Sequence, residues 1–260
     1  MASGSFYYKR YWGQSFLKSK QIAERLVSAL NLKEGDVVLE IGPGEGILTE
    51  FLIKYPVKVI AVEIDRSLVN FLKERFKGVK NLEIVPGDIL KYEPADILKI
   101  IGNIPYSISS ALLFYLFERW KKWTEAVLTL QKEFADRLLA LPSTKDYGAL
   151  TLISEIYAEK ERLFSIPPSF FRPQPKVMSC AIILRRRKKI LLTEPDFIEY
   201  LKSAFTHRRK TLLNNLADYF DITKERLKTI LEKKGFSPNL RAEELSLMEF
   251  KEIYDAIKRV

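Results

Sequence analysis

The sequence predicts an α/β protein: an open, doubly wound, mostly parallel sheet followed by a small all-helical domain. Five short runs rich in Val, Ile and Leu alternate with amphipathic stretches over residues 36–130. Strands as apolar as these suit a parallel sheet that is covered on both faces. After the basic run 185–189 the pattern becomes helical only. We therefore expect a sheet domain over residues 1–188 and a helical domain over 189–260.

The first five strands are expected at 36–42, 57–64, 82–89, 97–103 and 125–130. The stretches between them, such as "GILTEFLIKY" and "SLVNFLKERFKG", have apolar residues at helical spacing. Residues 150–164 and 179–187 are expected to close the sheet as a last pair of strands, one of them antiparallel.

Three helices are expected in the C-terminal domain. The first opens at "TEPD" and runs over 193–220, and the second, "TKERLKTILEKKG", ends at Gly235. Ser246 and Glu249 have the spacing of a capping box, which predicts the start of the third helix.

The composition narrows the class of protein. One cysteine, Cys180, and one histidine, His207, occur in 260 residues. A disulfide and a multi-cysteine metal site are thereby excluded, and we expect no metal and a reducing, cytoplasmic setting. No apolar run reaches the roughly 18 residues of a membrane span, so we expect a protein that is neither secreted nor membrane-embedded.

The positive charge predicts a polyanionic partner, RNA or DNA rather than a membrane. The net charge is +10, and residues 185–260 carry 18 Lys and Arg against 12 Asp and Glu. The excess is densest in "RRRKK" (185–189) and "HRRK" (207–210). We expect His207, Arg208, Arg209 and Lys210 to contact nucleic-acid phosphates. For "RRRKK", a strand end with a linker is as good an interpretation as nucleic-acid contact.

A glycine-rich loop, "GPGEG", follows the first strand. Its glycines are Gly42, Gly44 and Gly46, with Glu40 just before them. The dinucleotide fingerprint needs a glycine at position 47, where this chain has Ile47. The spacing G-x-G-x-G is instead typical of methyltransferases that use S-adenosylmethionine (SAM).

Polar side chains also stand at the ends of the next three strands. Glu63 can accept hydrogen bonds from ribose hydroxyls, and Asp88 from an adenine amino group. Ile64 and Ile89 can form apolar walls for the ring, and Asn103 ends the fourth strand. Each acid alone is at least as readily a helix cap. Because carboxyl ends of parallel strands meet at one edge, their joint occurrence favours a cofactor site.

The loop "NIPY" (103–106) has the chemistry needed to methylate an exocyclic amine. The lone pair of such an amine is delocalised into the ring, and two acceptors aimed at its hydrogens would localise it. The Asn103 side-chain oxygen and the Ile104 carbonyl can provide them, while Pro105 keeps the turn rigid. Tyr106 offers a ring on which a base stacks, typically worth roughly 1–3 kcal/mol. Placement contributes more than proton chemistry, so an uncharged Asn suffices.

Two further segments are expected at this site. "KRYWGQSFL" (9–17) contains a Gly13-Gln14 turn able to fold over the cofactor, and "SFFRPQPKVMS" (169–179) precedes the last strand. A base pulled out of its stack would be clamped between Tyr106 and an aromatic of this second segment. Phe171 is the better candidate than Phe170, and the alternative is that both belong to the core.

Together these motifs resemble the ribosomal-RNA adenine N6,N6-dimethyltransferase family, of the small-subunit type. The resemblance runs from "KRYWGQSFL" through "EIGPGEGILT", "AVEIDR", "GNIPYSIS" and "FFRPQPKVMS" to "FTHRRKTLLNNL" and "RAEELS". It implies catalysis by residues 103–106 and a base clamp at Phe171. It also implies SAM contacts at Gln14, Ser15, Leu17, Gly42, Glu63, Asp88 and Asn103.

The family usually has Asn where this chain has Ser15, and it differs at Arg172, Gln174 and Met178 beside the clamp. The resemblance further implies that the chain dimethylates two adjacent adenosines near the 3′ end of small-subunit rRNA, on the assembling subunit. We expect it to act as a monomer. Two alternatives stay open: a large-subunit rRNA adenine methylase of the macrolide-resistance type, and a non-catalytic nucleic-acid-binding factor on the same fold.

Overall fold

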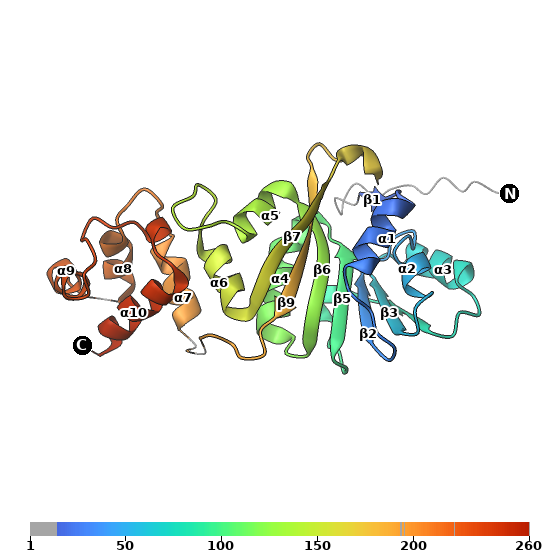
Figure 1. The fold of residues 1–260 in the computed structure, drawn as a ribbon, viewed down its shortest axis with the longest axis horizontal. Coiled ribbons are helices and arrows are strands. Elements are labelled where there is room, and N and C mark those ends of the chain that lie inside the picture. The colour runs from blue at the N-terminus through green and yellow to red at the C-terminus, as the bar shows by residue number, and fades with distance from the viewer. Residues whose placement is uncertain (1–14, 193, 195, 221, 260) are drawn as a thin grey trace. The chain divides into compact units, whose positions relative to one another are not determined.

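The structure is a computed structural model that describes residues 15–259 except 193, 195 and 221. Its residues form two compact units, 15–135 with 160–186 and 136–159 with 187–259. We call them the sheet unit and the helical unit (Figure 1). Among the described helices, none has the length and apolar character required to cross a bilayer.

The sheet unit is built on a seven-stranded sheet of order β4-β3-β2-β5-β6-β9-β7. The strands from β4 to β6 are parallel, and β9 runs antiparallel to β6. The expected sheet with one antiparallel strand in its outer part is confirmed. The bounds are β2 Val37–Ile41, β3 Lys58–Glu63, β4 Leu82–Pro86, β5 Leu98–Asn103, β6 Trp123–Gln131, β7 Ala158–Ile166 and β9 Ser179–Arg186.

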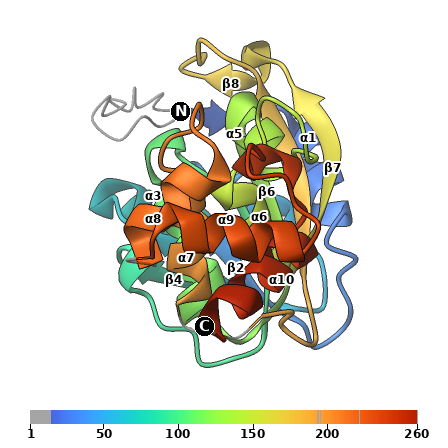
Figure 2. The same cartoon turned by 90° about the vertical axis from the view of Figure 1, so that its left-hand side faces the viewer.

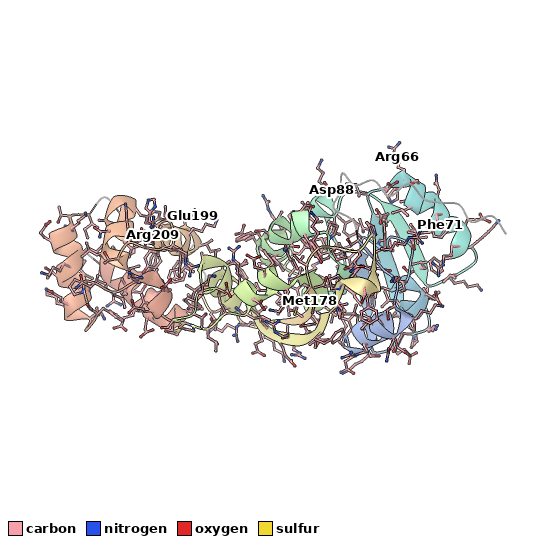
Figure 3. All side chains as sticks on the ribbon, turned by 90° about the horizontal axis from the view of Figure 1, so that it is seen from above. Arg66, Phe71, Asp88, Met178, Glu199 and Arg209 are labelled. Atoms are coloured by element: carbon pink, nitrogen blue, oxygen red, sulfur yellow. The ribbon has the colours of Figure 1, made fainter. Side chains whose placement is uncertain are left out.

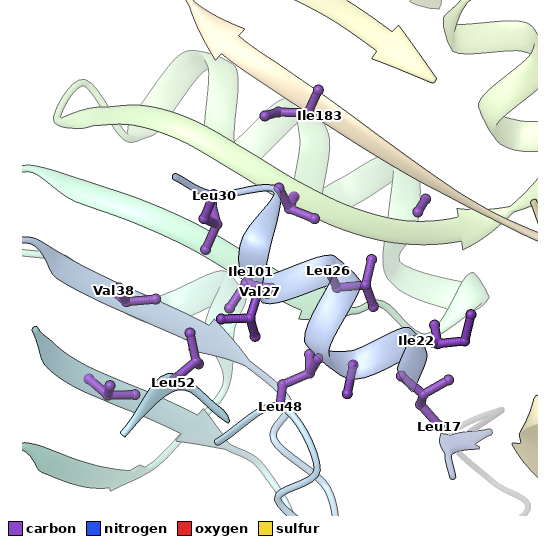
Figure 4. Packing of buried hydrophobic residues seen from close by; sticks show 14 of the residues in the cluster. Leu17, Ile22, Leu26, Val27, Leu30, Val38, Leu48, Leu52, Ile101 and Ile183 are labelled. Carbon is purple, nitrogen blue, oxygen red and sulfur yellow. The ribbon is translucent and has the colours of Figure 1, made fainter. Parts of the chain in front are cut away.

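One helix precedes the sheet in the chain, and the others follow its parallel strands. They are α1 Lys20–Ser28 before the sheet, α2 Thr49–Leu52, α3 Arg66–Arg75, and α4 Ser109–Phe114, which continues as a π-helical turn, η4 Tyr115–Arg119. Figure 4 shows α1 lying along one face of the sheet, with Leu26 and Val27 near Ile101 of β5. Ile100, which points to the opposite face of β5, is as inaccessible as Ile101, so both faces of this strand are buried. Burial on both faces explains why the strands are continuously apolar.

The strand expected at 150–164 is wrong in its first half. Residues Ala149–Tyr157 form helix α6, and β7 begins only at Ala158. Leu152, Ile153 and Ile156 are buried at helical spacing. A short apolar run fits a buried helix as well as a buried strand, and here the helix forms because α6 packs on α7 (Phe197–Ala204).

The helical unit contains residues 136–159 in addition to a second segment that starts at Arg187, two residues before the start at 189 expected from the sequence. The side chain of Tyr147 donates to the Leu245 carbonyl (2.8 Å) and its ring meets Phe205 edge-on, with centroids 6.2 Å apart. Figure 2 turns this unit toward the viewer, with α9 across its front. Its remaining elements are α8 Leu212–Phe220, α9 Lys224–Lys233, the 3₁₀ turn η6 Ala242–Glu244, and α10 Leu247–Lys258; the chain enters it through α5 Lys132–Leu138.

The single helix expected over 193–220 is two helices. Helix α7 ends at Ala204 and α8 starts at Leu212. The buried side chain of Asn215 donates to the carbonyl of Ala204 (2.7 Å), the last residue of α7, and to the carbonyl of His207 (3.3 Å), which lies beyond the helix end and also accepts from the Lys210 N–H. This side-chain cap closes α7 and sets the turn that carries residues 207–210. The capping box at the start of α10 is confirmed, because Ser246 and Glu249 exchange hydrogen bonds.

Candidate active site

A cavity of about 280 Å³ opens at the carboxyl edge of the parallel strands, where β2 lies between β3 and β5. This is the topological switch point of the sheet, where open α/β folds bind ligands. Eight of the ten residues expected to contact the cofactor line it. They are Ser15, Gly42, Gly44, Glu63, Ile64, Asp88, Ile89 and Asn103.

The other two behave differently. Gln14 lies outside the described residues. The side chain of Leu17 is 4% exposed and belongs to the hydrophobic core beside α1, so the structure does not bring it to the cavity. Its backbone instead pairs with Phe171 between two short strands, β1 (Phe16–Leu17) and β8 (Phe171–Arg172).

The glycine loop comes into close contact with its surroundings. Gly44 has a φ of +58°, and a Cβ there would lie 2.6 Å from Cδ1 of Phe16. At Gly46, with a φ of +83°, a Cβ would lie 2.7 Å from the ring of Phe76. Both positions therefore require glycine, for backbone conformation and for space. Phe16 lines the cavity, and no sequence pattern predicted it beyond its place beside Ser15.

Glu63, the last residue of β3, organises the cavity wall. One carboxylate oxygen accepts from the Gly44 N–H (3.2 Å), and the other accepts from the Asp65 N–H (2.9 Å). Burial raises the pKa of Glu63, while these backbone hydrogen bonds favour its charged form. The residue is thus both the expected ribose acceptor and a support for the glycine loop.

Glu40 lies deeper and takes a structural part. Its Oε2 accepts from the Thr49 hydroxyl (2.6 Å), which fixes the start of α2. Its Oε1 is buried, with no hydrogen-bond partner among the described residues. Burial, with the charge of Glu63 nearby, raises the pKa of Glu40 to about 7. The side chain therefore carries a proton for much of the time near neutral pH.

Asp88 follows β4 and is labelled in Figure 3. One carboxylate oxygen accepts from the Leu90 N–H (3.0 Å) and caps the 3₁₀ turn η2 (Ile89–Lys91). Ile89 is 7% exposed, whereas Ile64 is 42% exposed and offers an open apolar surface. The carboxylate and these walls have the chemistry that an adenine ring and its amino group require. Gly87, Leu90, Ser107 and Ile108 also line the cavity and were not expected from the sequence.

Asn103 stands at the end of β5, and its amide is oriented by a distant residue. Nδ2 donates to the carbonyl oxygen of Ser15 at 2.7 Å. The Ile104 N–H donates to the Thr129 carbonyl on β6 (3.1 Å), which continues the sheet one residue further. The Pro105 carbonyl accepts from the Ile108 N–H (3.1 Å), so the loop closes into the turn η3 (Tyr106–Ile108).

Tyr106 is held from β9. Its hydroxyl lies 2.7 Å from the Ser179 Oγ, and Ser179 is fully buried. Partial burial raises the pKa of Tyr106, so the phenol stays protonated at neutral pH. The hydrogen bond fixes the hydroxyl end of a half-buried ring.

Phe171 lies close to the loop formed by residues 103–106, but almost none of its side chain is exposed. It lines a small second pocket together with Ser15 and residues 103–106. Its side chain is only 2% exposed and packs in the core, whereas Phe170 is half-buried. The burial of Phe171 agrees with the alternative expectation that both phenylalanines belong to the core. The pocket lining agrees with the choice of Phe171 over Phe170.

The two basic segments differ. In "RRRKK", Arg185 pairs with Glu161 (2.8 Å) and Arg187 with Glu159 (3.1 Å), which favours the strand-end interpretation for the arginines. Residues 207–210 are exposed in the turn between α7 and α8, where Figure 3 labels Arg209. Arg208 is engaged: it donates to the Lys145 carbonyl (2.6 Å) and lies 3.2 Å from a Glu243 carboxylate oxygen.

Comparisons with known proteins agree in their result. The family model described as ribosomal RNA adenine dimethylase matches residues 6–259. A protein of Syntrophus aciditrophicus named ribosomal RNA small subunit methyltransferase A is 41% identical over 92% of this chain and 90% of its own length. A Streptococcus pneumoniae protein of the same name is 38% identical over 97% and 93%.

Two solved structures are also similar. A dimethyladenosine transferase from Plasmodium falciparum has a TM-score of 0.82 at 29% identity, covering 94% of this chain and 98% of its own. The 23S rRNA methyltransferase ErmE has a TM-score of 0.74 at 28% identity, covering 94% and 99%.

Proposed function

The chain belongs to the ribosomal RNA adenine dimethylase family and is an rRNA adenine dimethyltransferase of the small-subunit type, and we propose that its cofactor is SAM, held in the cavity at the sheet edge. One observation carries the proposal. Asn103 lines both the cavity with Glu63 and Asp88 and the small pocket with Tyr106. A methyl donor in the first and an amine in the second would therefore meet at this residue.

The residues lining the cavity fit SAM in their chemistry. The Glu63 carboxylate is placed for ribose hydroxyls, and Asp88 with Ile64 and Ile89 for the adenine. When bound, this cofactor supplies a methyl group activated by its sulfonium. Gly44 keeps the wall free of a side chain, and Phe16 closes the cavity beside Ser15.

The catalytic loop places the amine. The Oδ1 of Asn103 and the Ile104 carbonyl accept the two hydrogens of adenine N6, which localises its lone pair toward the methyl group. Tyr106 holds the base by stacking, and Phe171 also lines the small pocket. The methylated nitrogen is acidic enough to lose its proton to water, so no side chain has to act as a strong base. A second round on the same nitrogen gives the dimethyl product.

The substrate we propose is small-subunit rRNA in an assembling subunit in the cytoplasm, modified at two adjacent adenosines near its 3′ end by a monomeric enzyme. The test is SAM-dependent labelling of small subunits that lack the modification, followed by mapping of the labelled base. Labelling confined to large-subunit rRNA would favour the alternative of a large-subunit rRNA adenine methylase. A purified protein that binds no SAM would favour the non-catalytic alternative.

The helical unit contributes RNA contacts through the turn 207–210. Because Arg208 is engaged by Glu243 and the Lys145 carbonyl, we assign phosphate contacts to His207, Arg209 and Lys210, and to Arg208 the support of this turn.

The double replacement Arg209→Ala with Lys210→Ala is expected to reduce the magnitude of the negative slope of log affinity against log salt by roughly 1.5 to 2, since each phosphate contact releases about one counterion. Titrations of rRNA fragments at several salt concentrations measure it. Lys224→Ala with Lys233→Ala, two exposed positions at the ends of α9, changes the charge equally and is the control. If both double variants reduce the magnitude of the slope by the same amount, the turn 207–210 makes no specific contact with RNA phosphates.

A further inference from the structure

The geometry points to the backbone carbonyl of Ser15 as the group that decides which end of the Asn103 amide faces the target amine, and therefore to Asn rather than Asp as the residue required at position 103. This inference rests on the proposed function, because it concerns how the same loop receives an amine. It assigns a positioning part to Ser15 that does not depend on the Ser15 side chain.

The orientation of the amide follows from a single contact. A carbonyl oxygen only accepts hydrogen bonds, so the atom 2.7 Å from the Ser15 oxygen has to be the NH₂ end of Asn103. The other end, Oδ1, accepts no hydrogen bond from any described residue. Asn103 therefore presents an acceptor, which is what an amine with two hydrogens needs. The opposite orientation would present a donor and repel it.

The Ser15 carbonyl is itself held in place by the residues that follow it. Phe16 and Leu17 pair with Arg172 and Phe171 as a two-stranded ribbon, and the Lys18 N–H donates to the Phe170 carbonyl (2.9 Å). The Phe16 ring rests against the glycine loop at Gly44. Thus the segment that closes the cavity also fixes the catalytic amide, 88 residues further along the chain.

An aspartate at position 103 reverses this interaction. Its ionised carboxylate would place an oxygen against the Ser15 carbonyl oxygen, with no hydrogen between them. A protonated aspartate is nearly isosteric with asparagine: its O–H donates to Ser15 and its carbonyl oxygen accepts from the amine. A hydrogen bond that only the neutral form makes raises a carboxyl pKa. Asn103→Asp should therefore be active only in its protonated form.

Other charged groups near position 103 also influence the pH dependence of the rate. Their influence has to be separated from that of the added carboxyl group. The carboxylates of Glu63 and Asp88 line the shared cavity, and the Tyr106 phenol lines the small pocket. Three cations stand on nearby segments: Lys18 directly after β1, Arg172 on β8 and Lys132 at the start of α5. All of these are present in the wild type as well, in which residue 103 does not titrate. The ratio of variant to wild-type rate at each pH thus reports the added carboxyl group.

The test is the rate of subunit methylation by Asn103→Asp and by the wild type from about pH 5.5 to about pH 8.5, a range that spans neutrality. We expect the ratio of the two rates to fall about tenfold for each pH unit above the carboxyl pKa. Asn70→Asp, an exposed position on α3, should keep a constant ratio. A ratio for Asn103→Asp that does not change with pH would overturn the inference.

A second measurement does not depend on activity. Carbon-13 NMR of aspartate-labelled protein, without cofactor because a sulfonium would favour the carboxylate, gives the pKa of the added carboxyl group directly. We expect it at least about two units above the ordinary value of about 3.9, and near the ordinary value in Asn70→Asp. An ordinary pKa for the carboxyl group at position 103 would refute the proposal that the Ser15 carbonyl orients this side chain. A wild type that fails to methylate small subunits while this pKa is raised would instead refute the proposed function and leave the amide orientation standing.

Discussion

Replacing Asn103 by alanine is expected to reduce methyl transfer to small subunits by roughly 10³-fold, the scale seen when one preorganised hydrogen-bonding group of an active site is removed. The loss follows from the two jobs of the amide. Its Oδ1 is the side-chain acceptor that we propose for the amine, and its Nδ2 ties the end of β5 to Ser15. SAM binding should be largely retained, because Glu63 and Asp88 are unchanged.

Two measurements are needed for this variant: initial rates of label incorporation into small subunits, and calorimetric titration with SAM. Asn70→Ala on α3 is a matched control, since it deletes an exposed amide of the same size in the same unit. Unchanged activity in Asn103→Ala would refute the mechanism proposed for residues 103–106. Loss of SAM binding together with activity would show that the amide serves the cofactor rather than the amine.

Replacing Glu63 by alanine is expected to weaken SAM binding by at least about 100-fold, because the two hydrogen bonds that we propose from ribose hydroxyls to its carboxylate would be lost at about 1.5–3 kcal/mol each. The backbone N–H groups of Gly44 and Asp65 lose their acceptor at the same time. An unpaired donor at the cavity wall adds to the cost, since the glycine loop no longer has a fixed position.

Calorimetric titration with SAM measures this effect directly. Glu83→Ala on β4 is the control: Glu83 is exposed, and its surface ion pair with Lys58, at 3.5 Å, contributes little. Glu63→Gln separates the two parts of the residue, because it keeps one acceptor oxygen and turns an NH₂ group toward the other backbone N–H. If the Glu63→Ala protein binds SAM as tightly as the wild type, Glu63 is not the acceptor for the ribose hydroxyls.

The expectations that held were local in the chain. The strand ends at Glu63 and Asn103, and the glycine loop after β2, were located within one or two residues, since each is an apolar run that meets a turn. The cavity residues follow from this, because parallel strands bring their carboxyl ends together whatever the lengths between them. The strand expected to start at residue 150 was wrong, and residues 136–159 were not expected in the helical unit, because a short buried run has no period that tells helix from strand.

By itself, the sequence determined the parallel sheet, the glycine loop and the carboxylates at the strand ends, and it predicted an amine chemistry for residues 103–106. Only the tertiary structure decided how that chemistry is aimed. Asn103 takes its orientation from Ser15, Tyr106 is held by Ser179, and Phe171 is buried beside both. The reason is physical: these partners lie 73 and 88 residues apart in the chain, and they meet only when the whole sheet has packed. Periodicity and local propensity carry no information about such contacts.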